Sequence, residues 1–217
     1  MARMELPSPA RLAKWGFVAL AASQAVTIAA LSVVDSRRKK GQRRAGFPSL
    51  PPQELALNAG TVTIYTKGRS LYDDMLAAID AAKDRIYFET YIWKDDRVGA
   101  KFKEALIRAA ERGVDVFIAY DVFGNLVVPQ SFFRFPDSVH VLRHLPWSGI
   151  RGPIVRRSPG LNHRKLLIVD DAVGFIGGYN IGSLYANRWR DTHARVTGEP
   201  ALDLANAFVD YWNQTSG

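Results

Sequence analysis

The chain has 217 residues, a formal net charge of +8 and no cysteine. Because cysteine is absent, disulfides, thiolate metal sites and cysteine nucleophiles are excluded. The length is enough for one domain of ordinary size and an appendage. Residues 1–44 hold nine of the 29 Lys and Arg residues and two of the 21 acidic residues, so residues 45–217 hold twenty basic and nineteen acidic residues. This near-neutral larger part weakens an interpretation as a general nucleic-acid-binding protein.

The N-terminal segment predicts a single membrane-spanning helix. Residues 16–34 contain no charge, and about twenty apolar residues cross a bilayer core. Trp15 precedes the run, as an interfacial aromatic residue does. More positive charge follows the run than precedes it, which predicts a cell-membrane anchor with the remainder in the cytoplasm. A cleaved signal peptide is the alternative, and the long run followed by a basic cluster argues against it.

The basic cluster and the prolines after it suggest how the chain is divided. The cluster at residues 37–44 sets the topology, and in a second interpretation it also holds this segment against anionic lipid. Residues 45–54 contain three prolines and predict a linker. The predicted organisation is an anchor with a basic flank over residues 1–44, the linker, and a catalytic domain over residues 55–217.

In the larger part, segments with strand periodicity alternate with segments of helical spacing. This alternation favours an α/β domain in which helices pack on a mostly parallel sheet. Residues 145–161 are rich in proline and glycine and predict a loop. The predicted strands are residues 61–65, 85–93, 114–120, 139–142, 166–169, 172–176 and 192–196, and the predicted helices are residues 70–83, 98–112, 181–187 and 199–212.

Residues with catalytic chemistry concentrate around one predicted hairpin. His163 and Lys165 open the strand at residues 166–169, and alternate residues of a strand share a face. The returning strand ends at Gly177 and Gly178, where the backbone can approach a ligand closely. An imidazole, an ammonium and glycine N–H groups at one end of a hairpin suit a phosphate. The alternative, a buried hairpin with a polar rim, requires several coincidences.

The same stretch carries a family resemblance. H-x-K-x4-D followed by x6-G-G-x-N resembles the signature of the phospholipase D superfamily. N-H-R-K at residues 162–165 and G-G-Y-N at residues 177–180 further resemble the bacterial cardiolipin synthase branch. The resemblance implies a mixed sheet flanked by helices. The signature residues are His163, Lys165, Asp170, Gly177, Gly178 and Asn180, and further branch-like stretches lie at residues 88–91, 109–114, 120–124 and 189–193.

The resemblance implies phosphodiester transfer in two displacements. One histidine attacks phosphorus to form a phosphohistidine, and a second histidine protonates the leaving alcohol and activates the incoming one. Lysine and asparagine side chains hold the non-bridging oxygens. No metal or other cofactor is implied. The implied catalytic residues are His163, Lys165, Asp170, Asn180 and Asp191, with Gly177 and Gly178 at the substrate.

Four of the implicated residues have two interpretations each. Asp191 either supports the catalytic histidine by accepting its second N–H or pairs with a neighbouring arginine on the surface. Glu89 either borders the site and contacts substrate or pairs with an arginine as part of the structure. Arg156 and Arg157 either hold a second anionic group of the substrate or make a surface loop soluble.

The required second motif is not found, because His140, His144 and His193 lack a lysine two residues later. The chain therefore resembles the N-terminal half of a cardiolipin synthase. It is half of a longer enzyme, a homodimer that pairs two copies of His163, or an inactive remnant.

Three functions follow from these possibilities. The first is a membrane-anchored phosphatidyltransferase that acts on phosphatidylglycerol or a related phospholipid. The second is a phospholipase D or endonuclease of the same superfamily that acts as a homodimer. The third is a non-catalytic membrane-associated module.

Overall fold

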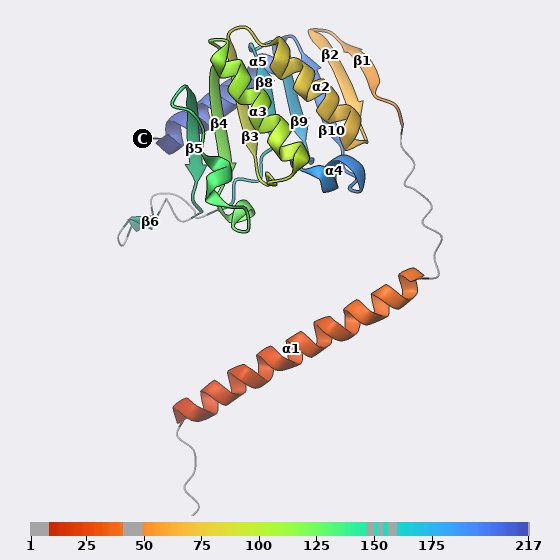
Figure 1. Ribbon diagram of the computed structural model, residues 1–217, viewed down its shortest axis with the longest axis vertical. Helices are drawn as coiled ribbons and strands as arrows, with labels where there is room; N and C mark the ends of the chain where they lie inside the picture. Colours follow the sequence, from red (N-terminus) through yellow and green to blue (C-terminus); the bar gives the residue numbers. More distant parts are fainter. Residues whose placement is uncertain (1–8, 41–49, 147–149, 152–153, 156–159, 217) are drawn as a thin grey trace, which may run out of the picture. The chain divides into compact units, whose positions relative to one another are not determined.

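The computed structural model describes residues 9–40, 50–146, 150–151, 154–155 and 160–216 (Figure 1). The chain forms two compact units, residues 1–47 and residues 48–217. In the first unit, helix α1 (Pro9–Lys40) contains the predicted apolar run. Its segment Trp15–Arg38 has 24 residues with a mean hydropathy of 2.0, which is long and apolar enough to cross a membrane. A signal sequence near the N-terminus has the same features, so the anchor remains a prediction.

The second unit is built on one mixed sheet of eight strands, in the order β1-β2-β10-β9-β8-β3-β4-β5. Only the pairs β3–β4 and β4–β5 are parallel, and the other neighbours are antiparallel. The strands are β1 (Gln53–Leu57), β2 (Gly60–Tyr65), β3 (Arg85–Thr90), β4 (Asp115–Asp121), β5 (Val139–His144), β8 (Leu166–Val169), β9 (Val173–Gly177) and β10 (His193–Thr197).

The mixed sheet confirms the implied fold class and corrects the expectation of a mostly parallel sheet. Parallel neighbours require a crossover, which α3 (Arg97–Glu111) supplies between β3 and β4. The turns between β1 and β2 and between β8 and β9 are too short for a crossover, so these strands pair as antiparallel hairpins. The linker prediction was also too long, because β1 begins at Gln53.

Helices cover both faces of the sheet (Figure 1). On one face, α2 (Gly68–Ala81), α3 and the short α4 (Ser183–Asn187) enclose the larger core, in which Leu71, Phe102 and Leu167 are fully buried. On the other face, α5 (Glu199–Ser216) buries Phe208, whose ring stacks on Tyr87 at 4.8 Å. Full burial of such a side chain stabilises the fold by about 1.5–3 kcal/mol.

The predicted loop at residues 145–161 contains a small hairpin of β6 (Ile150–Arg151) and β7 (Ile154–Val155). Two 3-10 helices, Phe123–Asn125 and Gln130–Phe133, lie in the connection between β4 and β5. The sequence pattern missed these elements because each is only two to four residues long.

One edge of the sheet brings together segments that are far apart in sequence. Strands β3, β4, β5 and β9 end at this edge, whereas β8 and β10 begin there, as the pairings require. The polar motif residues around His163 and Asn180 flank these strand ends. We call this edge the motif edge.

Candidate active site

Lys165 and His163 form a contact pair at the start of β8. The Lys165 Nζ atom lies 3.2 Å from the His163 ring Nδ1 and 2.6 Å from the His163 carbonyl oxygen. Lys165 is only 5% exposed, whereas the His163 ring reaches solvent. An ammonium group can only donate hydrogen bonds, so the ring nitrogen that faces it is an acceptor. The pair therefore favours the unprotonated imidazole, which is the nucleophilic form.

The charges around the pair favour the same protonation state. Partial burial and the Lys165 ammonium lower the pKa of His163, and Asp121 and Asp191 oppose this shift. Burial also lowers the pKa of Lys165, which Asp191 opposes. The lowered pKa of His163 keeps the imidazole neutral and able to attack at neutral pH.

Tyr91 packs beside this pair, although it was not among the predicted site residues. Its ring centroid lies 4.5 Å from that of His163, and the Lys165 Nζ atom lies 5.4 Å from the Tyr91 ring centre. A cation at that distance from an aromatic face is attracted by the ring quadrupole. The strand prediction ran through residue 93, but β3 ends at Thr90, so Tyr91 leaves the sheet at the motif edge.

Asn180 is held next to the same segment. Its side-chain oxygen accepts a hydrogen bond from the Ile92 N–H at 3.2 Å, and its carbonyl oxygen accepts one from the Tyr72 hydroxyl. The side chain is 9% exposed. The structure therefore anchors Asn180 against the residue that follows Tyr91. Its contact with a phosphate oxygen remains a prediction.

The two glycines of the motif leave space for residues 191–193, which pass close to them. A Cβ atom on Gly178 would lie 2.0 Å from the Asp191 Oδ1 atom, and one on Gly177 would lie 2.8 Å from the His193 ring. Gly177 therefore requires glycine, because the backbone of Thr192 and His193 approaches it closely, whereas a side chain at Gly178 would have to displace the Asp191 carboxylate. The sequence interpretation attributed this close approach to a ligand, and contact of Gly177 and Gly178 with substrate remains a prediction.

Asp191 lies in the notch that Gly178 leaves open. Its carboxylate accepts hydrogen bonds from the Thr192 N–H at 2.8 Å and from the Trp189 indole at 3.4 Å. The carboxylate acts on His163 through its charge, raising the pKa of the ring, while Lys165 makes the contact with the ring nitrogen. The predicted second hydrogen bond to the imidazole therefore remains untested.

His193 is buried behind this notch, at 2% exposure, and burial lowers its pKa to about 3. Its two ring nitrogens make no hydrogen bond to any residue that the structure describes. The ring fills the space beside Gly177. His193 is therefore a neutral side chain packed behind the site.

Asp170 lies away from this group, which corrects its expected place among the catalytic residues. It follows the last residue of β8, whereas Lys165 precedes the first. Its carboxylate accepts the N–H groups of residues 83–85 at 2.8–3.0 Å, and these bonds lower its pKa despite partial burial. Asp170 therefore ties the hairpin turn to the start of β3.

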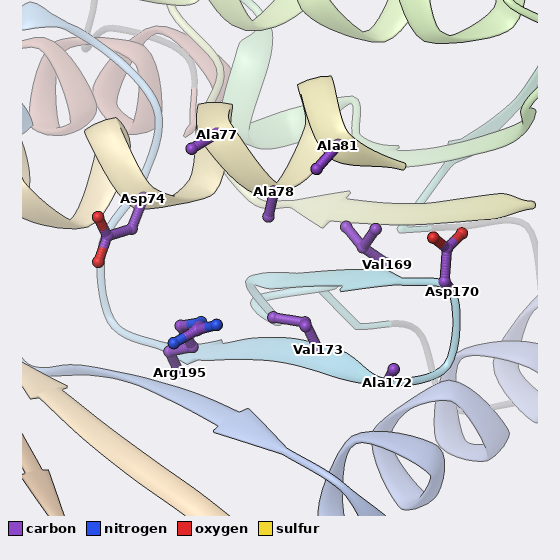
Figure 2. A pocket seen from close by; sticks show the side chains of 9 residues that line it. All are labelled: Asp74, Ala77, Ala78, Ala81, Val169, Asp170, Ala172, Val173 and Arg195. Carbon is purple, nitrogen blue, oxygen red and sulfur yellow. The ribbon is translucent and has the colours of Figure 1, made fainter. Parts of the chain in front are cut away.

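A hollow of about 490 Å³ lies beside Asp170, between α2 and the β8–β9 hairpin (Figure 2). The figure shows small side chains of α2, including Ala77, Ala78 and Ala81, facing the hairpin across the hollow. It lies at the opposite end of β8 from His163 and contributes nothing to the candidate site.

Glu89 forms a buried ion pair, which decides between its two interpretations. Its carboxylate accepts hydrogen bonds from the Asn162 amide and from the Arg164 Nε atom, and the Arg164 Nη2 atom lies 3.0 Å away. The Glu89 side chain is fully buried, and burial raises its pKa against the opposing charge of Arg164. The assignment of Glu89 to substrate contact is wrong, because Glu89 faces α5 and holds the chain on both sides of His163. We call Glu89, Asn162 and Arg164 the Glu89 clamp.

Two further contacts anchor the clamp. The Asn162 N–H donates to the Asp121 carboxylate at 2.8 Å, which fixes the chain to the end of β4. The Arg164 guanidinium lies over the ring of Tyr211 at 4.3 Å, which fixes it to α5. His163 therefore projects from a backbone that is held by β3, β4 and α5.

The loop before the clamp is tied to α5 through His144. The His144 Nε2–H donates to the Gly160 carbonyl oxygen at 2.9 Å, which leaves its Nδ1 atom to accept the Tyr211 hydroxyl at 2.7 Å. No sequence signal indicated this role. Arg156 and Arg157, the two predicted substrate contacts in this loop, lie outside the described residues.

Comparisons with known proteins place the chain in a family. The family model described as "Cardiolipin synthase, PLD-like domain" matches residues 75–212. The chain is 37% identical to the major cardiolipin synthase ClsA of Bacillus subtilis over 164 residues, which cover 72% of this chain and 34% of that protein. It is 34% identical to cardiolipin synthase A of Pseudomonas putida over 158 residues, covering 70% and 33%. The chain thus spans about a third of the length of these curated relatives.

Solved structures share the fold at low sequence identity. NucT from Helicobacter pylori matches with a TM-score of 0.57 and 16% identity, covering 71% of this chain and 96% of that one. The phospholipase D family member Nuc from Salmonella typhimurium matches at 0.53 and 22%, covering 76% and 94%. Phosphatidylserine synthase from Haemophilus influenzae matches at 0.54 and 19%, covering 76% and 38%.

The match to the PLD-like family model shows that the mixed sheet with the His163–Lys165 pair at its motif edge is a phospholipase D-like domain. Within that class, the chain belongs to the family of cardiolipin synthase PLD-like domains.

Proposed function

We propose that this chain is a membrane-anchored part of a phosphatidyltransferase that resembles cardiolipin synthase and uses His163 as its nucleophile. The observation that carries the proposal is the contact between the buried Lys165 ammonium and the exposed His163 ring. It combines a neutral imidazole with a fixed positive charge, and both are needed where a phosphodiester is attacked. The choice of a phospholipid substrate is inferred from the relatives, which are named cardiolipin synthases.

In the first displacement, a ring nitrogen of His163 forms a bond to the phosphorus of a phospholipid, with phosphatidylglycerol as the expected substrate. The bond from phosphorus to the leaving alcohol oxygen breaks, and that oxygen takes a proton from a second histidine. In the second displacement, the hydroxyl of another phospholipid returns a proton to that histidine and attacks phosphorus, which breaks the phosphorus–nitrogen bond. Lys165 and Asn180 stabilise the charge that develops on the phosphoryl oxygens.

The second histidine has to come from another motif, and we expect it from the remainder of a longer protein or from a second copy of this chain. The buried ring of His193 is unsuited to this role, because an acid and base for an alcohol must reach it. The catalytic domain is expected on the cytoplasmic side of the cell membrane. A phosphodiester and a phospholipid hydroxyl would be its ligands, and nucleic acid is not an expected partner.

The first displacement can be tested in the full chain, because a second copy of the chain can supply the histidine that protonates the leaving alcohol. The purified full chain is incubated in vesicles that contain phosphatidylglycerol labelled with ³²P, quenched and assayed for acid-labile label on protein. We expect label on the wild type and on His140→Ala, whose histidine stacks on Phe117 at the opposite end of β5, but none on His163→Ala. Equal labelling of the wild type and His163→Ala would refute the role of His163.

Product analysis tests the whole reaction. Cardiolipin in the lipid extract supports phosphatidyl transfer, and phosphatidic acid supports a phospholipase D. Cleavage of plasmid DNA without lipid turnover would contradict the lipid assignment and favour the endonuclease alternative. Absence of both turnover and covalent label, in protein shown to be folded, would contradict activity of this chain as a homodimer and leave it as part of a longer enzyme or as an inactive module.

A further inference from the structure

A surface beside the candidate site combines exposed apolar side chains with basic ones. Leu184 is 50% exposed on α4, and Trp189 is 46% exposed just after it. The two residues belong to one turn, because the Trp189 N–H donates to the Leu184 carbonyl oxygen at 3.1 Å. Arg188 is exposed between them, and Arg69 of α2 is bound to α4 through the side chain of Asn187 at 2.8 Å. We call Leu184, Arg188, Trp189 and Arg69 the α4 patch.

The indole of Trp189 is oriented by its neighbours. Its N–H donates to Asp191 at 3.4 Å, and the Tyr185 ring meets it edge-on at 5.9 Å. The polar edge of the indole is thus satisfied by the protein, while almost half of the residue remains in solvent. Amphipathic aromatic rings of this kind are enriched where one end meets hydrocarbon and the other meets polar groups.

Two carboxylates next to the α4 patch, those of Asp191 and Asp96, are hydrogen-bonded to the protein. The Asp191 carboxylate accepts hydrogen bonds from Trp189 and Thr192. The carboxylate of Asp96 accepts N–H groups of Ser183, Val98 and Gly99. These hydrogen bonds turn both carboxylates toward the protein but leave their charge in place. The exposed charged side chains of the patch itself are Arg188 and Arg69, and their cations suit anionic lipid headgroups.

A second exposed apolar segment at the motif edge lacks this charge. Phe123, Leu126 and Val127 are 49%, 62% and 83% exposed after β4. No basic residue occurs between Asp121 and Arg134 in the sequence. Charge is depleted at the centre of protein interfaces, so this uncharged segment suits a protein partner better than an anionic surface. Because only the α4 patch combines apolar and basic side chains, it fits an anionic lipid surface better than the segment after β4 does.

We propose that the α4 patch is a docking surface for an anionic bilayer, with Leu184 and Trp189 entering the headgroup region and Arg188 and Arg69 contacting lipid phosphates. Asn180 lies three residues before α4, so docking there places the motif edge against the layer that contains phosphodiesters. The proposal concerns a surface and does not depend on turnover. The test below measures membrane contact and not enzymatic activity. A negative result would therefore contradict the docking surface without contradicting the catalytic assignment.

The absence of cysteine makes the test direct, because one introduced cysteine is the only labelling site. Leu184→Cys of the full chain carries a fluorophore in nanodiscs that contain anionic lipid, and quenching by lipids with a nitroxide on the acyl chain is measured. Glu111→Cys, at the exposed end of α3 far from the motif edge, is the matched control. Arg188→Cys is the second variant, and thermal unfolding verifies that each labelled chain is folded.

We expect at least twofold stronger quenching at residues 184 and 188 than at residue 111. The difference should shrink when zwitterionic lipid replaces anionic lipid or when salt is raised, because surface attraction is screened within about 10 Å at 0.1 M salt. Equal quenching at residues 184 and 111 would overturn the proposal. So would excimer emission from pyrene at residue 184 without lipid quenching, which would identify a second copy of the chain as the occupant.

Discussion

The Glu89 clamp predicts a loss of stability whose size depends on which partner is removed. Arg164→Ala leaves a fully buried carboxylate without its counter-charge, and removing one partner of a buried ion pair typically costs about 3–5 kcal/mol. For a chain of this size each kcal/mol lowers the Tm by about 2–4 °C. We therefore expect Arg164→Ala to lower the Tm by roughly 10 °C.

Glu89→Gln should cost much less. The amide keeps an oxygen that can accept from Asn162 and Arg164, and it removes a charge that burial opposes. Arg164 is 37% exposed, so its cation remains partly solvated without the carboxylate. We expect a loss of about 1 kcal/mol, within the range of one neutral hydrogen bond. The double variant should be more stable than Arg164→Ala alone.

The pH dependence follows from the raised pKa of Glu89. A carboxyl group whose pKa is higher in the folded state contributes stability below its unfolded pKa, and this contribution is lost as the pH rises through the folded pKa. Removing Arg164 raises the folded pKa further, because Arg164 is the largest opposing influence. The penalty of Arg164→Ala should therefore be smaller at pH 5 than at pH 8.

Thermal unfolding of the detergent-solubilised full chain, followed by near-ultraviolet circular dichroism at both pH values, measures these differences. An Arg164→Ala penalty that equals that of Glu89→Gln, or that does not change with pH, would refute the clamp as described.

Three further predictions concern the site and its supports. Lys165→Met should raise the pKa of His163, because a neighbouring positive charge is removed, and should move the acid limb of phosphohistidine formation to higher pH; an unchanged ring titration by NMR contradicts this. Gly178→Ala should lower the Tm and alter the His163 ring signals in NMR spectra, because its Cβ would lie 2.0 Å from the Asp191 carboxylate and displace it. Ring signals identical to those of the wild type would show that Asp191 moves without affecting His163. Asp170→Ala removes the acceptor of three backbone N–H groups at exposed residues, where water can replace it, so we expect a loss of about 1–3 kcal/mol in unfolding free energy while the pKa of His163 stays the same. A shifted pKa of His163 would indicate that Asp170 acts on the candidate site.

The sequence by itself located the hairpin and the His163–Lys165 pair. His163 and Lys165 are two residues apart just before an apolar run, and alternate residues of an extended chain share a face, so the sequence predicted their contact although β8 begins only at Leu166. The same local reasoning found α2, α3 and α5 with boundaries shifted by a few residues, because helical periodicity is read within each segment.

The tertiary structure decided every relationship between segments distant in the chain. Glu89 is 75 residues from Arg164, and only the pairing of β3 with β8 brings them together and turns both toward α5. The same pairing leaves Asp170 at the far end, although its sequence spacing matched the motif as well as that of Lys165. Spacing along a strand fixes which face a side chain occupies, but partners across a sheet depend on strand order and register, which no local pattern encodes.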